Sequence, residues 1–343
     1  MSSSSICFIP IGATVREQIV EIRSQIKNWI GSNAFADLLR LYERDLELSG
    51  RLDADLEQLE QFSDRWDFRR IARERGAATD DNLSLGSGAA RWLSAGTGFS
   101  PEVEARIIAD AEDLGLVHDA EPSKRQYDYF LVLGGARLSC QLRPLRAAEL
   151  IRCGVEVRNI ALLGAARPVA QSERDATDTY APGAVDEFDL IVAGSKEAFG
   201  FDTEGFVEDR YDDPHNKNLS WVIRTLDFDF NQRPLRLFAI SAPSSDPVHR
   251  RANSADTWSF LLDRMKPVPG SNLLLITSQI YVPYVQLEAL RTIALPHGLF
   301  VETVGFPGDR MPQLQGLTNA NNYLQEVRST IQAARRLCLA FPE

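Results

Sequence analysis

The chain lacks the cysteine and histidine patterns of a metal site or a disulfide framework. Its four cysteines are scattered without a CxxC pair, and its four histidines show neither HxxxH nor HxH spacing. Zinc sites use closely spaced Cys and His ligands, and disulfide frameworks belong to cysteine-dense secreted domains. We therefore expect neither a metal site nor structural disulfides.

Long apolar runs are also missing. The chain has no run of about 18 apolar residues, the length that spans a bilayer as a helix. The first ten residues lack the basic start and apolar region of a signal peptide. We expect a soluble, cytoplasmic protein that does not contact the membrane.

Positive charge is in the minority. There are 37 Lys and Arg against 48 Asp and Glu, and the formal net charge is −11. Proteins that bind nucleic acid through its phosphates favour a basic face. The net charge therefore disfavours tRNA as a partner, although a local basic groove remains compatible with it.

What the chain does contain divides into two patterns. Apolar residues recur at helical spacing from Val15 to Ile30, and helical patterns continue to about residue 116. From residue 127 onward, short apolar runs alternate with helical patterns, as in α/β domains. With 343 residues, we expect a helical N-terminal segment at 1–120 and an α/β domain with a C-terminal helix at 121–343.

Five apolar runs predict the strands of the α/β domain, at 127–133, 157–163, 235–240, 272–277 and 299–304. Helices are expected at 145–153, 185–199, 252–265, 281–295 and 318–338. The acidic residues 202–218 predict an exposed, irregular excursion, and residues 219–226 a short helix.

The first strand ends in Gly134-Gly135. Glycine has no Cβ, so backbone can approach a ligand there, and ligands of doubly wound sheets bind outside the carboxyl ends of the strands. The turns expected to gather at this edge are 134–137, 164–167, 241–245 and 277–279. A tight strand-to-helix turn without a ligand would require the same glycines.

Three groups of residues match the order of motifs in a known family. They are Leu133-Gly134-Gly135 with Arg146-Ala147, then Asp186-Glu187-Phe188-Asp189, and finally Asn253-Ser254-Ala255-Asp256-Thr257 with Leu274-Leu275-Ile276-Thr277-Ser278. Over about residues 127–305 the chain resembles the YdcF/SanA/ElyC-like family. The resemblance implies a Rossmann-like, three-layer domain with a mostly parallel sheet. Tyr281 and Tyr284 stand where the family commonly has His and Arg, which implies a changed ligand.

Glu187 is the candidate catalytic residue, as a general acid or base. Arg146, and with it Arg137, is expected to bind a phosphate or carboxylate. The complete set of candidate ligand contacts is Gly134, Gly135, Arg137, Arg146, Asn253, Ser254, Asp256, Thr257, Thr277, Ser278 and Tyr281. Structural alternatives are open for several of them, because Glu187 also suits a helix start and residues 253–256 form a helix-cap signature.

These residues lead to the hypothesis of a group transferase that acts on a nucleotide-containing or S-adenosylmethionine-like small molecule. Redox chemistry is disfavoured because the first turn lacks GxGxxG spacing. One alternative is a transferase using aminoacyl-tRNA or another large substrate, held by Arg69, Arg70, Arg73 and Arg75. Another is a non-catalytic ligand-binding or interaction module.

Overall fold

A computed structural model gives the structure of residues 14–41, 46–67, 70, 98–306 and 319–342. The chain forms two compact units. One comprises 1–119, 279–291 and 307–343, and the other 120–278 and 292–306. The first is called the helical unit below and the second the sheet unit. The expected boundary near residue 120 coincides with one crossing between them, and the helical unit also takes in two later segments.

The described part of the helical unit contains helices and connecting turns. Its elements are α1 (Val15–Ile30), α2 (Asn33–Arg40), α3 (Leu52–Ser63), η1 (Asp64–Trp66), α6 (Pro101–Asp113), η5 (Gln279–Tyr281), α11 (Val282–Ala289) and α13 (Ala320–Ala340). A capping box between Thr14 and Glu17 starts α1, and Ser100 with Pro101 starts α6. The predicted helical N-terminal segment is therefore confirmed. Of the four arginines expected to contact tRNA, Arg69, Arg73 and Arg75 lie outside the described residues.

The sheet unit is built on one seven-stranded sheet with the order β3-β4-β5-β2-β1-β6-β7. The strands are β1 (Tyr129–Leu133), β2 (Asn159–Leu163), β3 (Val207–Tyr211), β4 (Trp221–Phe230), β5 (Arg233–Ser241), β6 (Asn272–Ser278) and β7 (Phe300–Phe306). Strands β5, β2, β1, β6 and β7 are parallel, and β4 and β3 add to β5 in antiparallel fashion. The predicted α/β fold with a mostly parallel sheet is confirmed.

The order of the parallel strands reverses at β1. The chain runs from β1 outward through β2 to β5, and then returns to place β6 on the other side of β1. Residue pairs such as Leu131 with Ala161 and with Leu275 fix β1 between β2 and β6. In open α/β sheets, ligands bind at such a reversal, outside the carboxyl ends of the strands.

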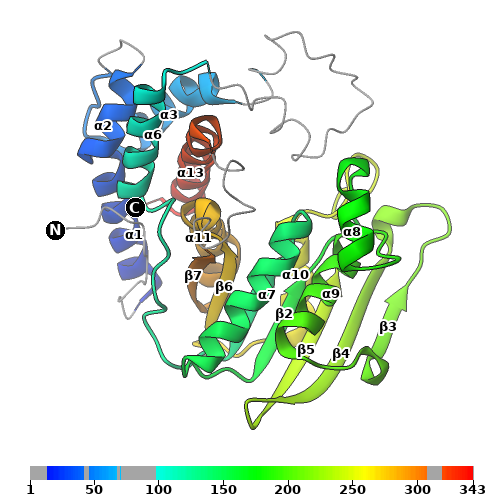
Figure 1. Ribbon diagram of the computed structural model, residues 1–343. Helices are drawn as coiled ribbons and strands as arrows, with labels where there is room; N and C mark the ends of the chain where they lie inside the picture. The colour runs from blue at the N-terminus through cyan, green and yellow to red at the C-terminus, as the bar shows by residue number, and fades with distance from the viewer. Residues whose placement is uncertain (1–13, 42–45, 68–69, 71–97, 307–318, 343) are drawn as a thin grey trace. The chain divides into compact units, whose positions relative to one another are not determined.

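The α-helices of the sheet unit are α7 (Arg137–Arg152), α8 (Arg174–Tyr180), α9 (Glu187–Phe199), α10 (Ser254–Met265) and α12 (Leu295–His297). Its short 3-10 turns are η2 (Gln171–Glu173), η3 (Thr203–Gly205) and η4 (Lys217–Leu219). A π-helical turn, η6 (Leu290–Ala294), lies where the chain re-enters this unit. Helices α7 and α9 lie side by side over one face of the sheet (Figure 1). Gly194 allows this close approach, because a Cβ there would clash with the Cys140 carbonyl oxygen.

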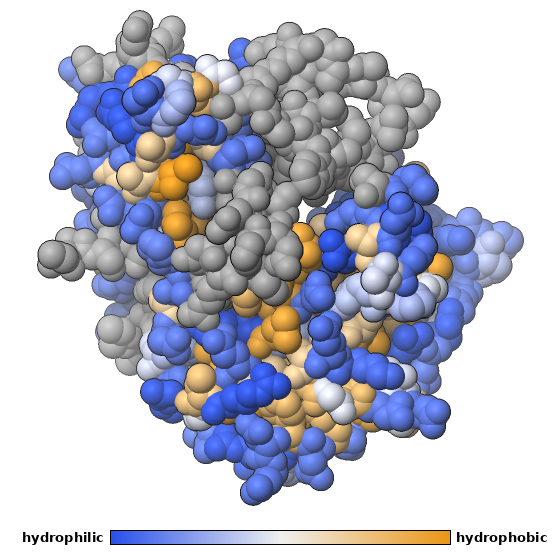
Figure 2. Space-filling model, in the orientation of Figure 1, coloured by the Kyte–Doolittle hydropathy of each residue, from blue (hydrophilic) through white to orange (hydrophobic). Residues whose placement is uncertain are grey.

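The core of the sheet unit is apolar, and includes Phe130, Leu162, Phe188, Ile191, Leu237 and Ile276. On the face seen in Figure 2, small hydrophobic areas are separated by polar side chains. Among the described helices, none is both long and apolar enough to cross a membrane.

The helix predicted at 219–226 is wrong, because these residues belong mostly to strand β4. The segment is rich in β-branched residues and pairs on both sides, with β3 and β5. The predicted irregular excursion contains β3, whose five residues are all exposed. An exposed, charged edge strand carries no apolar signal, so only its pairing with β4 reveals it.

Helix α7 begins earlier than predicted, at Arg137 directly after the glycine turn. Pro144 lies inside it. Proline usually marks a helix start or break, which explains the later predicted start at 145. The eight extra residues, about two turns, matter because they carry Arg143 back to the end of β1.

Candidate functional site

The candidate site lies where β1, β2 and β6 end. The Gly134 amide donates to the Leu163 carbonyl oxygen (2.8 Å), and the Gly164 amide donates to that of Ile240 (3.0 Å). These bonds continue the parallel pairing into the turns. The turns after β1, β2 and β5 are therefore held together at one edge of the sheet.

Glu187 is the first residue of α9 and is buried against this edge. Its carboxylate lies over Gly134, where a Cβ would fall far inside van der Waals contact with Oε1 and 2.7 Å from the Leu163 carbonyl oxygen. Gly164 likewise leaves room for the Phe188 backbone. The glycines after β1 and β2 thus let the start of α9 approach the sheet and place an acid over the turn.

The neighbouring acids have structural roles at the same helix start. Asp186 caps α9 by accepting the Asp189 amide (3.1 Å), and Asp189 accepts the Val185 amide (3.0 Å). Both are therefore engaged with backbone at the helix start. Glu187 is left as the acid that faces the turn.

Arg143 joins the ends of β1 and β6. Its Nη1 donates to the carbonyl oxygens of Leu133 (2.9 Å) and Gly134, and its Nη2 lies 3.2 Å from the hydroxyl oxygen of Ser278. The residue is only 4% exposed. A guanidinium is suited to this role because its planar fork can donate in several directions. Arg143 therefore stiffens the point at which the strand order reverses and brings a positive charge there.

Arg167 forms an ion pair with Glu187. Its Nε lies 2.9 Å from Oε2, and its side chain is 21% exposed. The backbone also connects the two, since the Glu187 amide donates to the Arg167 carbonyl oxygen (2.9 Å). Arg167 thus holds the buried carboxylate while part of its guanidinium remains accessible.

Arg251 supplies a third positive charge. Desolvation and the charge of Arg167 lower the pKa of Arg251, whereas Glu187 opposes this. The residue as a whole is exposed, and the charges of both Arg167 and Glu187 act on its guanidinium. An arginine stays protonated in any case.

Burial raises the pKa of the Glu187 carboxyl, although Arg167, Arg143 and Arg251 all act to lower it. The charges of three guanidinium groups therefore act on a single, buried carboxyl group, and one of them, that of Arg167, contacts it directly. Together these residues are called the arginine cluster below: Arg143, Arg167, Glu187 and Arg251. Their chemistry suits an anionic group on a ligand, with an acid beside it that can exchange a proton.

Cys140 lies close to the cluster and is fully buried. Burial, and after it the negative charge of Glu187, raises the pKa of its thiol. Its Sγ contacts the Gly135 carbonyl oxygen at 3.3 Å. A thiol that keeps its proton is a poor nucleophile, so Cys140 acts as packing beneath the turn.

The structure brings only part of the predicted set to the cluster. Gly134, Gly135, Glu187 and Ser278 lie at the edge described above, and Thr277 is buried at the end of β6. Tyr281 belongs to the helical unit.

The two predicted arginines have other surroundings. Arg146 is 2% exposed and forms ion pairs with Glu149 (3.0 Å) and Glu121 (3.3 Å). Arg137 is the first residue of α7, and its charge acts on the hydroxyl of Tyr180. Ligand binding by either arginine remains a prediction.

The residues at the start of α10 form its cap. Asn253 and Asp256 make a reciprocal capping box, and the Thr257 hydroxyl donates to the Asn253 carbonyl oxygen (3.1 Å). Ser254 is the first residue of the helix and is exposed. Asp256 also pairs with Arg250. These contacts give Asn253, Asp256 and Thr257 structural partners, and a direct contact of any of the four residues with a ligand remains a prediction.

Sequence reasoning missed Arg143, Arg167 and Arg251 as individual residues. Arg143 lies one turn before the predicted Arg146, and Arg167 lies inside one of the predicted turns. Arg251 is the second of two consecutive arginines, and nothing local distinguishes it from Arg250. In the described part of the chain, no group of three or more His, Cys, Asp and Glu residues could hold a metal ion.

Comparison with known proteins identifies the family. The family model described as the Rv3785 N-terminal domain matches residues 13–115. Uncharacterized protein Rv3785 of Mycobacterium tuberculosis (strain ATCC 25618 / H37Rv) is 36% identical over 326 residues, which cover 93% of this chain and 90% of the relative. The chain belongs to the Rv3785 family. Uncharacterized protein Mb3814 of Mycobacterium bovis matches this Rv3785-family chain with the same identity and coverage.

The resemblance to the YdcF/SanA/ElyC-like family is therefore wrong, because the family model and the nearly full-length relatives belong to the Rv3785 family instead. The motifs behind it were a glycine turn, an acidic helix start and a strand ending in Thr-Ser. Doubly wound sheets of unrelated families need such features for their geometry. These motifs therefore do not distinguish one family from another. No solved structure matches this Rv3785-family chain significantly.

Proposed function

We propose that this protein is a group transferase whose sheet edge binds the phosphate group of a small molecule, most simply a nucleotide. The observation that carries the proposal is the arginine cluster at the reversal of strand order, in which Arg167 pairs with the Glu187 carboxyl group and the charges of Arg143 and Arg251 also act on it. The cluster has an excess of positive charge in a chain whose net charge is −11. A bound phosphate would balance that excess.

The positions of the arginines assign them different parts. Arg143 is tied to backbone carbonyl oxygens and contributes mainly its charge. Arg167 and Arg251 keep accessible surface and are the groups that would donate to phosphate oxygens. S-adenosylmethionine carries a sulfonium cation, which three arginines would repel, so a nucleotide suits the cluster better.

Glu187 is the proposed general acid or base. Burial raises its pKa, so the carboxyl group keeps its proton to a higher pH than an exposed glutamate. A carboxyl group whose pKa is raised by burial can donate a proton to a reacting group as well as accept one. Group transfer needs such a group to accept a proton from the attacking atom or to donate one to the leaving atom.

We also propose a cytoplasmic location. The described cysteines, Cys140, Cys153 and Cys338, are all free thiols. Free thiols are typical of reducing compartments.

Thermal unfolding with a panel of compounds tests the proposal. The panel is inorganic phosphate, pyrophosphate, AMP, ADP, ATP and S-adenosylmethionine. A bound compound at a hundredfold excess over its Kd stabilises by about 2.7 kcal/mol, so the Tm should rise with phosphate compounds. The rise should shrink in Arg167→Ala and Arg251→Ala.

The matched control is Arg236→Ala, which removes an exposed arginine paired with Asp227 on the β4–β5 hairpin. It should leave the ligand-induced rise unchanged. If none of the phosphate compounds raises the Tm of the wild-type protein, or if Arg251→Ala shows the full rise, the proposal is overturned.

A further inference from the structure

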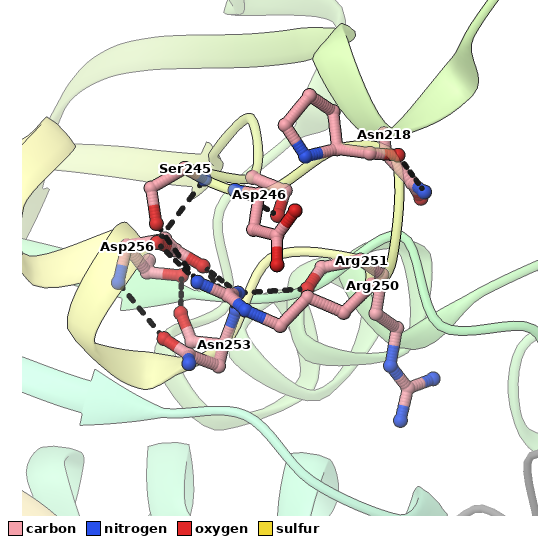
Figure 3. A network of polar contacts seen from close by, with 10 residues as sticks. Asn218, Ser245, Asp246, Arg250, Arg251, Asn253 and Asp256 are labelled. Carbon is pink, nitrogen blue, oxygen red and sulfur yellow. Dashed lines mark hydrogen bonds and ion pairs between the residues drawn. The ribbon is translucent and has the colours of Figure 1, made fainter.

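Two consecutive arginines in the loop between β5 and α10 point in different directions. Figure 3 shows the Arg250 guanidinium within a network around Asp256, whereas the Arg251 guanidinium lies apart from that network. The charge of Arg251 acts on Glu187, and the charges of Glu187 and Arg167 act on it in turn. Arg250 therefore makes contacts within the loop, whereas Arg251 is directed to the proposed phosphate site.

Asp256 is the centre of the network. Its carboxylate accepts the backbone amides of Asn253 (2.8 Å) and Ser245 (3.2 Å). It also accepts hydrogen bonds from both terminal nitrogens of Arg250, with Nη2 at 3.2 Å. One buried carboxylate thus fastens both ends of the loop to the first turn of α10 (Figure 3).

The charged state of Asp256 is strongly favoured. Burial acts to raise the pKa of its carboxyl group, but hydrogen bonds from Arg250, Ser245 and Asn253 outweigh burial and lower the pKa to about 2. The ion pair with Arg250 is therefore intact at neutral pH.

Arg250 connects this carboxylate to Arg251 directly. Its Nη1 donates to the carbonyl oxygen of Arg251 (3.0 Å), and its Nη2 donates to the Ser245 hydroxyl (2.8 Å). The peptide that follows Arg251 is thereby fixed through a two-step connection, from Asp256 to Arg250 and from Arg250 to the carbonyl oxygen.

A second set of contacts holds the middle of the loop. The side-chain amides of Asn216 and Asn218 each donate to the Pro247 carbonyl oxygen (3.0 Å). The Ser244 amide donates to the Asn218 carbonyl oxygen (2.7 Å). The loop is therefore fixed at three places, and the side chain of Arg251 starts from a restrained backbone.

We propose that Asp256 is a positioning residue, which acts through Arg250 to hold the backbone of Arg251 so that the Arg251 guanidinium meets the phosphate group of the ligand. This inference rests on the proposed function. Its physical basis is preorganisation: a restrained backbone lowers the entropy that a long side chain loses when it binds. In this role Asp256 acts through Arg250 and not through a ligand contact of its own.

A double-mutant cycle tests the inference, with pyrophosphate as the probe in isothermal titration calorimetry. The variants of the full chain are Asp256→Asn, Arg251→Ala and the combination of both. Arg251→Ala should weaken binding by about tenfold or more, because it removes a charged contact with the probe. Asp256→Asn should weaken binding by about fivefold, because the Arg251 contact is kept but is less well preorganised. In the Arg251→Ala background, Asp256→Asn should add almost nothing, because the residue that it positions is gone.

Two further variants separate positioning from folding. Arg250→Lys keeps the positive charge but lacks the fork that reaches both Asp256 and the Arg251 carbonyl oxygen, so it should also weaken binding about fivefold. Asp227→Asn breaks an exposed Asp–Arg pair of the same type on β4 and should leave the affinity unchanged. If Asp256→Asn does not fold, the cycle is completed with Arg250→Lys in its place.

The outcomes distinguish this inference from the proposed function. If wild-type protein fails to bind pyrophosphate, or Arg251→Ala binds it equally well, the proposed function fails. If Arg251→Ala weakens binding but Asp256→Asn and Arg250→Lys bind normally, only the positioning role fails. Additive losses in the double variant would also overturn that role.

Discussion

The carboxylate of Glu187 occupies the space that a side chain on Gly134 would fill. The two residues are separated by more than fifty positions in the sequence and come from different elements, the turn after β1 and the first turn of α9. Glycine is therefore needed at position 134 to leave space for the Glu187 carboxylate, and not only for the conformation of its own turn. This relationship connects the backbone of the proposed site to its candidate proton-transfer group.

Substitution of Gly134 by alanine should displace Glu187. The new methyl group would clash with Oε1 and would lie 2.7 Å from the Leu163 carbonyl oxygen. Overpacking of this kind costs about 1–3 kcal/mol, so we expect the free energy of unfolding in urea to fall by that amount. Pyrophosphate affinity should fall with it.

The double variant Gly134→Ala with Glu187→Ala provides the check. Removing the Glu187 carboxylate leaves only the contact with the Leu163 carbonyl oxygen, so the double variant should lose less than the sum of the two single losses. Strict additivity would contradict the contact.

The stability of the protein should depend on the ionisation of Glu187. Burial holds the folded-state pKa of Glu187 above its ordinary value of 4.5. A raised carboxyl pKa contributes stability below the unfolded-state pKa, and that contribution is lost as pH rises through the folded-state pKa. The free energy of unfolding of the wild type should therefore fall relative to Glu187→Gln as pH increases.

Urea unfolding of the wild type and of Glu187→Gln, from about pH 4 to about pH 8, measures this difference. The other titrating groups are present in both proteins, so their contributions cancel in the difference between the two free energies of unfolding. A difference that increases with pH in favour of the wild type would show that Arg167, Arg143 and Arg251 outweigh burial.

Arg143 and Arg146 lie one turn apart on α7, and the same substitution should affect them differently. Arg143→Met removes a charge from the cluster and should weaken pyrophosphate binding at least about tenfold. Arg146→Met removes ion pairs to Glu149 and Glu121, both of which keep solvent contact. Its effect should be mainly a loss of about 1–3 kcal/mol of stability.

Calorimetric titration and urea unfolding of both variants measure the two effects separately. Equal losses of affinity would mean that Arg146 also serves the site, as its sequence position suggested.

Tyr127→Phe should destabilise the protein without affecting the site. The Tyr127 hydroxyl donates to Glu302, and burial and this partner raise the pKa of the phenol. Loss of a hydrogen bond to a charged group costs roughly 1.5–3 kcal/mol. Because Tyr127 precedes β1, at the end of the strand opposite to Gly134, pyrophosphate affinity should stay within error. A Tm that does not change would show that Ser123 alone satisfies Glu302.

Much of the fold followed from local patterns. Buried strands such as β1, β2 and β6 are uninterrupted apolar runs that end at glycine or hydroxyl residues. Buried parallel strands need no alternation, so length and termination identify them. Strands β3 and β4 were missed because their stability depends on pairing with each other and with β5, a long-range property that no short window contains.

The site was predicted less completely than the fold. The glycine turn and Glu187 could be located because strand ends and helix starts are local features. Arg143 depends on how many residues of α7 precede Pro144, and Arg251 depends on which of two adjacent arginines is held by Asp256. Tertiary contacts determine both features, and no local sequence pattern indicates them.

The division of the chain has a consequence for the order of synthesis. After Ser278 the chain leaves the sheet unit, returns at Thr292, and leaves again after Phe306. Helix α13, which packs against α3, α6 and α11, therefore leaves the ribosome after all strands of the seven-stranded sheet have been made. The helices before residue 119 are translated earlier, but their packing is complete only once α13 has been made. A fragment cut after residue 119 would therefore lack a helix that α3 and α6 pack against.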